Sequence, residues 1–472
     1  MGRRAGLRQA LILSFALLFL ATNASAATYY VDCSTGNNSN DGSSGSPWLT
    51  LRYAGDHISG GDTVVIKDGA CTATEASNDQ HWGPAGSSGS YTTWKCENAG
   101  DCTIDGPIRT TTGTPSYYSF EDLVVTNGGF WWEAATGTWT NFRLLNSNVS
   151  GGGNEFNADS DSSNWSCLFL QDGENAEVSG NTIHDCASVE LDCLGGQACG
   201  AGIKLYTVST STFEHNLIYD NAVEGISQKQ AGDGNIYRRN IIKNNIYNIY
   251  HCNQGVCTTS QIYENIFQCT SDDQIGVLLK LFNQDHEIYN NVFYNCGGSL
   301  VAYSTTTEAD SNTGTEFYNN ISYNPSQASG DPRNLEFERW DVNEPTTQDY
   351  NVYYNTRLVE NRYCNSGALG AGDCDELSAE YFPLSGSNFT TWKTHSGKDA
   401  HSYAQDPVFV SLSSGSEDFH LQVSSPGRGT GSTSNDIGAY PRRDSTVIGP
   451  EGSGGSSEGP GLGRIGVGGR SL

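Results

Sequence analysis

The sequence has few positive charges for its length. Its 472 residues include 25 lysines and arginines against 53 aspartates and glutamates, so the formal net charge is −28. A polyanion repels nucleic acid and anionic membranes, and both are excluded as partners. The acidic excess has two interpretations: solubility in a salty medium, which is favoured, and binding of divalent cations such as calcium.

Long apolar runs are also scarce. The clearest one, residues 10–21, follows a basic start and precedes the small residues Ala24-Ser25-Ala26, a pattern typical of an export signal over residues 1–26. No later segment approaches the ~20 apolar residues that a membrane helix needs. We therefore expect a secreted protein, extracellular or periplasmic, without a membrane span.

The sequence lacks the clustered CxxC pairs of a zinc site, although it contains fourteen cysteines. An even number of cysteines in an exported protein favours disulfides. Four pairs are close in sequence and three wider pairs would complete seven bridges: Cys96/Cys102, Cys193/Cys199, Cys252/Cys257 and Cys364/Cys374, then Cys33/Cys71, Cys167/Cys186 and Cys269/Cys296.

Helical periodicity is nearly absent, and a short asparagine motif takes its place. The motif reads Asn, apolar, bulky, any residue, then usually Asn or Asp. Its copies begin at Asn181, Asn216, Asn240, Asn265, Asn291, Asn320 and Asn351, with steps of 35, 24, 25, 26, 29 and 31 residues. A period in the twenties is typical of a solenoid, in which each short strand is buried only by stacking on its neighbours.

The motif asparagines are interpreted as structural. Asparagine tolerates the left-handed backbone of a tight turn, and its amide can hydrogen-bond to nearby main chain. Repeated at one position, it can form an internal ladder of amide hydrogen bonds. Widened steps, such as the one over residues 186–200, indicate loops inserted on one face, which would wall a groove.

The two ends of the chain differ from the repeats. Pro47, Trp48, Leu51 and Ala54 predict a short amphipathic helix that caps the open end of the stack. Residues 441–472 are rich in Gly, Ser and Pro and predict a flexible tail. The predicted organisation is a signal peptide over 1–26, one solenoid domain over 27–440, and the tail.

Specific stretches at both ends of this domain carry a family resemblance. Near the start they are Tyr30-Val31-Asp32, Asn40-Asp41-Gly42, Pro47-Trp48 and Gly61-Asp62-Thr63-Val64, and near the end Asp406-Pro407, Phe419-His420-Leu421 and Asp436-Ile437-Gly438-Ala439-Tyr440. With the repeated Asn-Ile-Ile turns, the chain resembles secreted right-handed parallel β-helix proteins of the pectin-lyase-like superfamily. The resemblance implies an all-β, right-handed parallel β-helix solenoid with an N-terminal helical cap.

The same resemblance leaves the chemistry open, because the superfamily includes polysaccharide lyases, glycoside hydrolases, epimerases and non-enzymatic surface proteins. The Tyr-Gly-x-Asp-Pro sequence of alginate epimerases is absent, and the paired-aspartate strand of polygalacturonases is not recognisable. No catalytic residue can be transferred motif for motif.

Four segments that precede successive motif copies predict a candidate site. They are residues 202–206, 225–229, 248–252 and 276–280, each with an Ile or Val expected to point inward. Basic and polar residues then gather near one wall, with the register uncertain by one residue. The catalytic candidates are Lys204, Lys229, His251 and Lys280, and the substrate-binding candidates are Tyr206, Gln228 and Tyr250.

This grouping suits elimination from a uronic acid. A cation must neutralise the carboxylate before a base can remove the adjacent proton, and lysine or histidine can supply either function. The most favoured function is therefore a polysaccharide lyase acting on uronate-containing glycans by β-elimination. No metal ligands are assigned at this wall, and calcium is the expected cofactor if a bridging ion is needed.

Two alternatives stay open. A glycoside hydrolase would use two carboxylates, with Asp185, Asp192, Asp220, Glu224 and Asp233 as candidates. A non-enzymatic adhesin or surface-fibre subunit would use end-to-end self-assembly instead. Two oxygen-rich loops, residues 159–164 and 308–312, resemble partial calcium sites, although plain surface loops are favoured.

Overall fold

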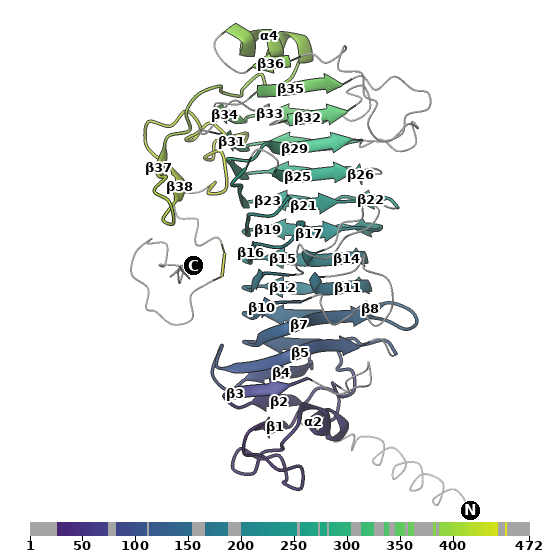
Figure 1. Cartoon of the computed structure of the whole chain (residues 1–472). Helices are drawn as coiled ribbons and strands as arrows, with labels where there is room; N and C mark the ends of the chain where they lie inside the picture. The colour runs from purple at the N-terminus through teal and green to yellow at the C-terminus, as the bar shows by residue number, and fades with distance from the viewer. Residues whose placement is uncertain are drawn as a thin grey trace, which may run out of the picture.

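The solenoid axis is defined by short parallel strands stacked in rungs (Figure 1). The computed structural model describes residues 26–73, 82–110, 113–152, 166–186, 200–252, 255–271, 274–280, 283–303, 313–324, 335–338, 345–354, 357–362, 381–383, 387–441 and 449–450. The expected signal peptide and almost all of the expected tail lie outside the described residues.

Three faces wind in the same order in every turn, and we number them in chain order. Face 1 is a twelve-stranded parallel sheet. It consists of β1 (Thr28–Val31), β2 (Thr63–Ile66), β4 (Thr92–Cys96), β6 (Tyr118–Glu121), β9 (Phe142–Leu145), β12 (Glu177–Ser179), β15 (Thr212–Glu214), β19 (Ile236–Arg238), β23 (Gln261–Tyr263), β27 (Glu287–Tyr289), β30 (Glu316–Tyr318) and β33 (Thr347–Asp349).

Faces 2 and 3 belong to one continuous sheet because two long strands, β5 (Cys102–Thr110) and β7 (Val124–Glu133), run across both. Face 2 continues with β3 (Gly69–Thr72), β10 (Asn148–Ser150), β13 (Thr182–His184), β16 (Leu217–Tyr219), β20 (Ile241–Lys243), β24 (Ile266–Gln268), β28 (Val292–Tyr294), β31 (Ile321–Tyr323) and β34 (Val352–Tyr354). Face 3 continues with β11 (Ser166–Glu174), β14 (Ala201–Ser209), β17 (Glu224–Gln228), β21 (Tyr247–His251), β25 (Ile275–Lys280), β29 (Gly298–Tyr303), β32 (Leu335–Glu338) and β35 (Arg357–Arg362).

Smaller strands complete the stack. β8 (Trp139–Thr140) pairs with β11, and β18 (Gly232–Asp233), β22 (Cys257–Thr258) and β26 (Asn283–Gln284) form a short sheet after face 3. β36 (Tyr381–Pro383) runs antiparallel to β35, and β37 (Phe409–Ser411) runs antiparallel to β38 (Asp418–Leu421).

Apolar side chains at one position per strand fill the interior. Strand alternation sends every second side chain inward, and identical positions stack between rungs about 4.8 Å apart. Inward columns include Phe213, Ile262 and Ile288 on face 1, Ile183, Ile218, Ile242, Phe267 and Phe293 on face 2, and Ile203, Ile226, Ile249, Val277 and Leu300 on face 3. The motif's bulky residue thus belongs to the core.

The motif asparagines form the expected ladder at the corner between faces 1 and 2. Each of Asn181, Asn216, Asn240, Asn265 and Asn291 donates its Nδ2 to the Oδ1 of the next asparagine at 3.0–3.1 Å, and all are fully buried. The left-handed conformation, however, falls on the residue before the asparagine, with φ between 54° and 57° at Arg239, Glu264 and Asn290. The side-chain amide of the ladder asparagine therefore forms hydrogen bonds with the asparagines of the neighbouring rungs.

The N-terminal helix is present but starts later than expected. α2 spans Leu51–His57 and begins after Thr50, whose side chain accepts a hydrogen bond from the Tyr53 amide at 3.2 Å. Pro47 is not in the helix, because its carbonyl accepts hydrogen bonds from the preceding loop. That α2 caps the stack stays a prediction.

The C-terminal region closes the other end and covers one face. The helix α4 (Ser387–Ser396), which the sequence did not predict, lies beyond β35 in Figure 1 and buries Phe389 and Trp392. β37 and β38 pack on the outer side of face 2, where Phe409 and Phe419 join Ile321 and Val352 in one apolar cluster. β37 and β38 do not pack on face 3.

Candidate functional site

The outer side of face 3 carries the predicted lysines. Ile203 and Leu205 are both in the core, so Lys204 between them points outward. Strand pairing aligns Lys204 with Ser227 of β17, and Ser227 with Tyr250 of β21. Lys204 is fully buried despite pointing away from the core.

Two further lysines lie two positions along the strands, again on the outside. The Nζ of Lys229 lies 5.8 Å from the centre of the Tyr206 ring, and the Nζ of Lys280 lies 5.6 Å from that of Tyr250. Cations held over aromatic faces are stabilised by the ring quadrupole. Only eight lysines occur in the chain, and three of them meet at this place.

A buried glutamate faces the three lysines. Glu224, the first residue of β17, is fully buried, and neither of its carboxyl oxygens has a hydrogen-bond partner. The neighbouring Gly225 explains its direction, because a Cβ at Gly225 would point inward and lie 2.6 Å from the Asn248 carbonyl oxygen. Glycine is therefore required there. Because Ile226 also faces the core, the strand bends between Gly225 and Ile226, and this break in the alternation leaves Glu224 on the outer side with Lys204, whose charge lowers the pKa of Glu224.

The charges of this cluster, Glu224 with Lys204, Lys229 and Lys280, are coupled. Burial raises the pKa of Glu224, while the charges of Lys204, Lys229 and Lys280 oppose the rise. The Ser227 hydroxyl also lowers the pKa of Glu224, although the two groups do not reach hydrogen-bond geometry. A buried carboxyl near several lysines holds charges in a medium of low dielectric constant, where each charge shifts the pKa of its neighbours.

Lys280 is the accessible member of the cluster. It is about half buried, and this burial lowers the pKa of its ammonium group, with the charge of Glu224 opposing the change. Tyr247, paired with Glu224 through the β17–β21 register, is also partly exposed. Burial and the Glu224 charge raise the pKa of Tyr247. Lys280 and Tyr247 are therefore the members of the cluster that solvent reaches.

The structure places Gln228 and His251 on the inner side of their strands instead of on the outer wall, because alternation turns both side chains into the solenoid. Gln228 accepts hydrogen bonds from Asn235 Nδ2 at 3.0 Å and from the Tyr237 hydroxyl at 3.2 Å. His251 Nδ1 lies 2.8 Å from Asn283 Oδ1, and burial lowers the pKa of His251 to about 4. These residues are structural, not part of the outer wall.

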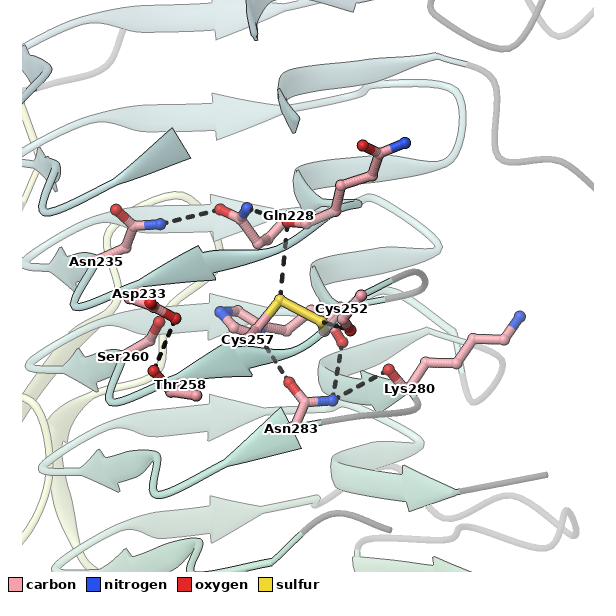
Figure 2. Close-up of a disulfide and its surroundings, with 12 residues drawn as sticks. Gln228, Asp233, Asn235, Cys252, Cys257, Thr258, Ser260, Lys280 and Asn283 are labelled. Atoms are coloured by element: carbon pink, nitrogen blue, oxygen red, sulfur yellow. Dashed lines mark hydrogen bonds between the residues drawn. A yellow bond between two sulfur atoms is a disulfide. The ribbon is translucent and has the colours of Figure 1, made fainter. Parts of the chain in front are cut away.

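His251 still has an indirect connection to the site. Asn283 Nδ2 donates to the backbone carbonyls of His251 at 3.3 Å and of Lys280 at 3.1 Å. Figure 2 shows Asn283 below the Cys252–Cys257 disulfide, with the Lys280 side chain extending away from both. The interior amide therefore anchors the backbone from which Lys280 projects.

The remaining carboxylate candidates are less suited to chemistry. Asp185 has a side chain that is 68% exposed and bonds to His184, and Asp220 and Asp233 are also exposed. Asp192 and the two oxygen-rich loops lie outside the described residues. Among the residues that the structure describes, no group of three or more His, Cys, Asp or Glu could hold a metal ion.

Glu224 and Tyr247 are the members of the site that the sequence analysis ranked too low or missed. Glu224 appeared only as one of many carboxylates, and Tyr247 was not named. Alignment of the segments 202–206 and 225–229 on their inward isoleucines pairs Lys204 with Ser227 and leaves Glu224 opposite Ala201, so register alone does not bring Glu224 to Lys204. The missing information was the bend at Gly225.

Five of the seven expected disulfides are present: Cys33–Cys71, Cys96–Cys102, Cys167–Cys186, Cys252–Cys257 and Cys269–Cys296. The other four cysteines lie outside the described residues. Neither described helix is long or apolar enough to cross a membrane. The disulfides fit an oxidising compartment.

Comparison with known proteins supports the fold. The family profile for a right-handed beta helix region matches residues 119–248 and 153–334. The structure of pectate lyase Pel9A has 16% sequence identity and a TM-score of 0.54, and the alignment covers 88% of this chain and 96% of that one. No curated protein matches the chain in sequence.

Two further solved structures align with lower TM-scores. PfbA, a surface adhesin of Streptococcus pneumoniae, has 11% identity and a TM-score of 0.44 over 66% of this chain and 84% of its own. Alginate lyase AlyF-OU02 has 15% identity and a TM-score of 0.38 over 64% and 82%. In its fold, the chain is a right-handed parallel β-helix.

Proposed function

We propose that the protein is a secreted polysaccharide lyase that cleaves a uronate-containing glycan by β-elimination on the outer side of face 3. The observation that carries the proposal is the convergence of Lys204, Lys229 and Lys280 around one buried carboxyl in a chain of net charge −28. Local positive charge in an acidic protein suits an anionic substrate. Pel9A, which shares the fold, is a pectate lyase.

The cations neutralise the uronate carboxylate. Elimination begins at the carbon next to that carboxylate, where the proton becomes acidic only when the charge that develops on the carboxylate is stabilised. Lys229 lies over the Tyr206 ring and, although buried, is the lysine proposed for this contact. Lys204, fully buried, adds positive potential from behind.

Lys280 is proposed as the base. Its ammonium group is half buried and its pKa is lowered, which increases the neutral fraction available near neutral pH. The neutral amine takes the proton from C5, the released electron pair forms the C4–C5 double bond, and the C4–O bond breaks. Tyr250, under the Lys280 Nζ, positions the amine, and Tyr247 is a donor for the departing oxygen.

Glycoside hydrolysis is the second candidate, and one observation favours it. Glu224 is a buried carboxyl with a raised pKa, which is the property of a general acid. A hydrolase needs a second carboxylate across the bond. No second carboxylate accompanies Glu224 in the cluster described here, so elimination is preferred.

The test is a screen of purified protein against alginate, pectate, chondroitin and neutral glycans, recording ultraviolet absorbance and reducing ends together. It is run with and without calcium, because an acidic protein could use a bridging cation to hold an anionic polymer. Elimination predicts that both signals rise on an anionic glycan. New reducing ends without a rise in absorbance would indicate a hydrolase instead of a lyase. No change in either signal would favour an adhesin.

A further inference from the structure

Arg109 lies near the end of β5, on the outer side of face 3. Its neighbour Ile108 is in the core, so alternation directs Arg109 outward. The strand register pairs Arg109 with Trp131 of β7, and the Arg109 Cζ is 5.0 Å from the centre of the Trp131 ring. Both side chains are partly exposed, so solvent reaches this pair.

The Arg109 guanidinium has no acidic partner among the residues that the structure describes. Its Nε–H is buried and has no hydrogen-bond acceptor. Two carboxylates on the same strands bond to other donors. Glu133 accepts from the Trp131 Nε1 at 2.9 Å, and Asp105 accepts from the Asn127 Nδ2 at 2.7 Å.

Two arginines on face 1 show the contrast. Arg143 also lies over an aromatic ring, that of Tyr91 at 4.1 Å, but its Nε is 2.8 Å from Glu177 Oε2. Arg238 is likewise paired with a glutamate, at 2.6 Å. In a chain with 53 acidic residues, a guanidinium held on a ring without a carboxylate is suited to an anion that comes from outside the protein.

An aromatic column joins Arg109 to the lysine cluster on the same face. The register pairs Trp131 with Phe169, and the two ring centres are 4.6 Å apart. Phe169 is in turn paired with Lys204. Three strand steps of about 4.8 Å therefore separate Arg109 from Lys204, about 14 Å along the solenoid axis. Only a ligand of several sugars can contact both ends of this column.

We infer that Arg109 is a second anion-binding point on face 3, which takes a carboxylate of a uronate oligosaccharide several sugars away from the lysine cluster. The choice of a uronate ligand rests on the proposed function. A planar guanidinium matches a carboxylate through two parallel hydrogen bonds, and stacking on Trp131 limits its orientation. A neutral glycan lacks the group that Arg109 recognises.

The test measures binding of saturated oligogalacturonates and oligomannuronates, from disaccharides to octasaccharides, by isothermal titration calorimetry in the Lys280→Met background. Arg109→Gln should weaken octasaccharide binding by about 10- to 100-fold, because a charge-assisted hydrogen bond is lost. A disaccharide cannot reach both points, so its binding at the lysine cluster should be unchanged. Arg143→Gln, which removes a stacked arginine from face 1, is the matched control and should change neither affinity.

Arg109→Lys keeps the positive charge over Trp131 and loses the planar fork, so octasaccharide binding should fall by less than in Arg109→Gln. This variant supplies the same comparison if Arg109→Gln does not fold, as judged by circular dichroism. The order Arg109, then lysine, then glutamine is the expected order of affinity.

The outcomes separate the inference from the proposed function. Unchanged octasaccharide binding in folded Arg109→Gln overturns the inference, even if the screen shows elimination. Weakened binding without absorbance on any glycan supports the anion-binding point and rejects the lyase. If no uronate oligosaccharide binds and no absorbance appears, both the inference and the lyase are wrong.

Discussion

Two sets of buried polar side chains can be compared within this one solenoid. In the asparagine ladder, Asn265 accepts from Asn240, donates to Asn291 and to the Tyr237 carbonyl, and all of its polar atoms are satisfied. On face 3, Glu224 and Ser227 are as deeply buried, yet their oxygens lack partners. The buried Nε2 of His251 also lacks a hydrogen-bond partner, so an unsatisfied atom does not by itself indicate function, and what distinguishes Glu224 is its position among charged lysines.

The largest expected effect is on catalysis. Lys280→Met keeps the length of the side chain and removes the proposed base, so kcat should fall by about 10²- to 10⁴-fold. Absorbance assays on the accepted glycan measure this loss. Lys243→Met is the control, because Lys243 lies over the Tyr219 ring on face 2 in a similar arrangement, at 5.4 Å. Equal loss in both variants would contradict a specific site on face 3.

The next effect concerns acid stability. Burial lowers the pKa of His251 to about 4, from 6.5 for an unperturbed histidine, so the unfolded chain binds a proton that the folded chain does not. The stability from neutral His251 is complete above pH 6.5 and is lost as the pH falls through 4, by about 3 kcal/mol in total. Urea denaturation across this range should show the loss.

His286, whose pKa is also lowered by burial and by His251, adds to the loss in the same direction. His251→Gln can retain the contact with Asn283 and should flatten the pH dependence. His401→Gln, at a side chain that is 60% exposed, should leave the dependence unchanged. A native protein as stable at pH 4 as at pH 7 would contradict this account of the interior.

The next prediction concerns the asparagine ladder, whose polar side-chain atoms have hydrogen-bond partners. Asn265→Ala removes the acceptor for the Asn240 side chain and backbone amide and exposes the Tyr237 carbonyl to an empty space. The free energy of unfolding should fall by about 1–3 kcal/mol, because buried partners are left unsatisfied. Gln261→Ala, on the outside of face 1, should stay within about 0.5 kcal/mol of the native protein. A neutral Asn265→Ala would show that the ladder is dispensable.

The smallest effect is expected at a surface ion pair. Arg238 Nε lies 2.6 Å from Glu214 Oε2 on the outside of face 1, where solvent screens the charges. Glu214→Gln should reduce the free energy of unfolding by under about 1 kcal/mol, and the difference should disappear in high salt. Chemical denaturation at two ionic strengths measures it. A larger, salt-independent loss would mean that the pair supports the sheet.

Repeated features were predictable from the sequence, and bends were not. The Asn-Ile-Ile turns fix a period and an inward residue, so the parallel solenoid, the ladder and five disulfides could be predicted. The site depended on the register of single residues: Lys229 and Lys280 were placed correctly, while Gln228 and His251 were assigned to the wrong side. Strand alternation has a period of two, and an uncertainty of one residue reverses the face.

Non-repeating parts were hardest to predict. α4 has little amphipathic pattern and is held by Trp392, whose indole Nε1 donates to the buried Asp399 at 2.8 Å. Asp399 also accepts from Ser402 and Gln348, so it ends the ladder through long-range contacts. The contact with Gln348 joins residues 51 positions apart, whereas Ser402 and Trp392 lie 3 and 7 positions from Asp399. Local sequence does not encode the distant contact.

The central claim is that the cluster of Glu224, Lys204, Lys229 and Lys280 on face 3 forms the glycan site. The most direct measurement is a crystal structure of the Lys280→Met variant with a saturated uronate oligosaccharide. The account predicts a uronate carboxylate beside Lys229, with its C5 facing residue 280 and the sugar next to Tyr247. An oligosaccharide bound to face 1 or face 2, with face 3 empty, would contradict it.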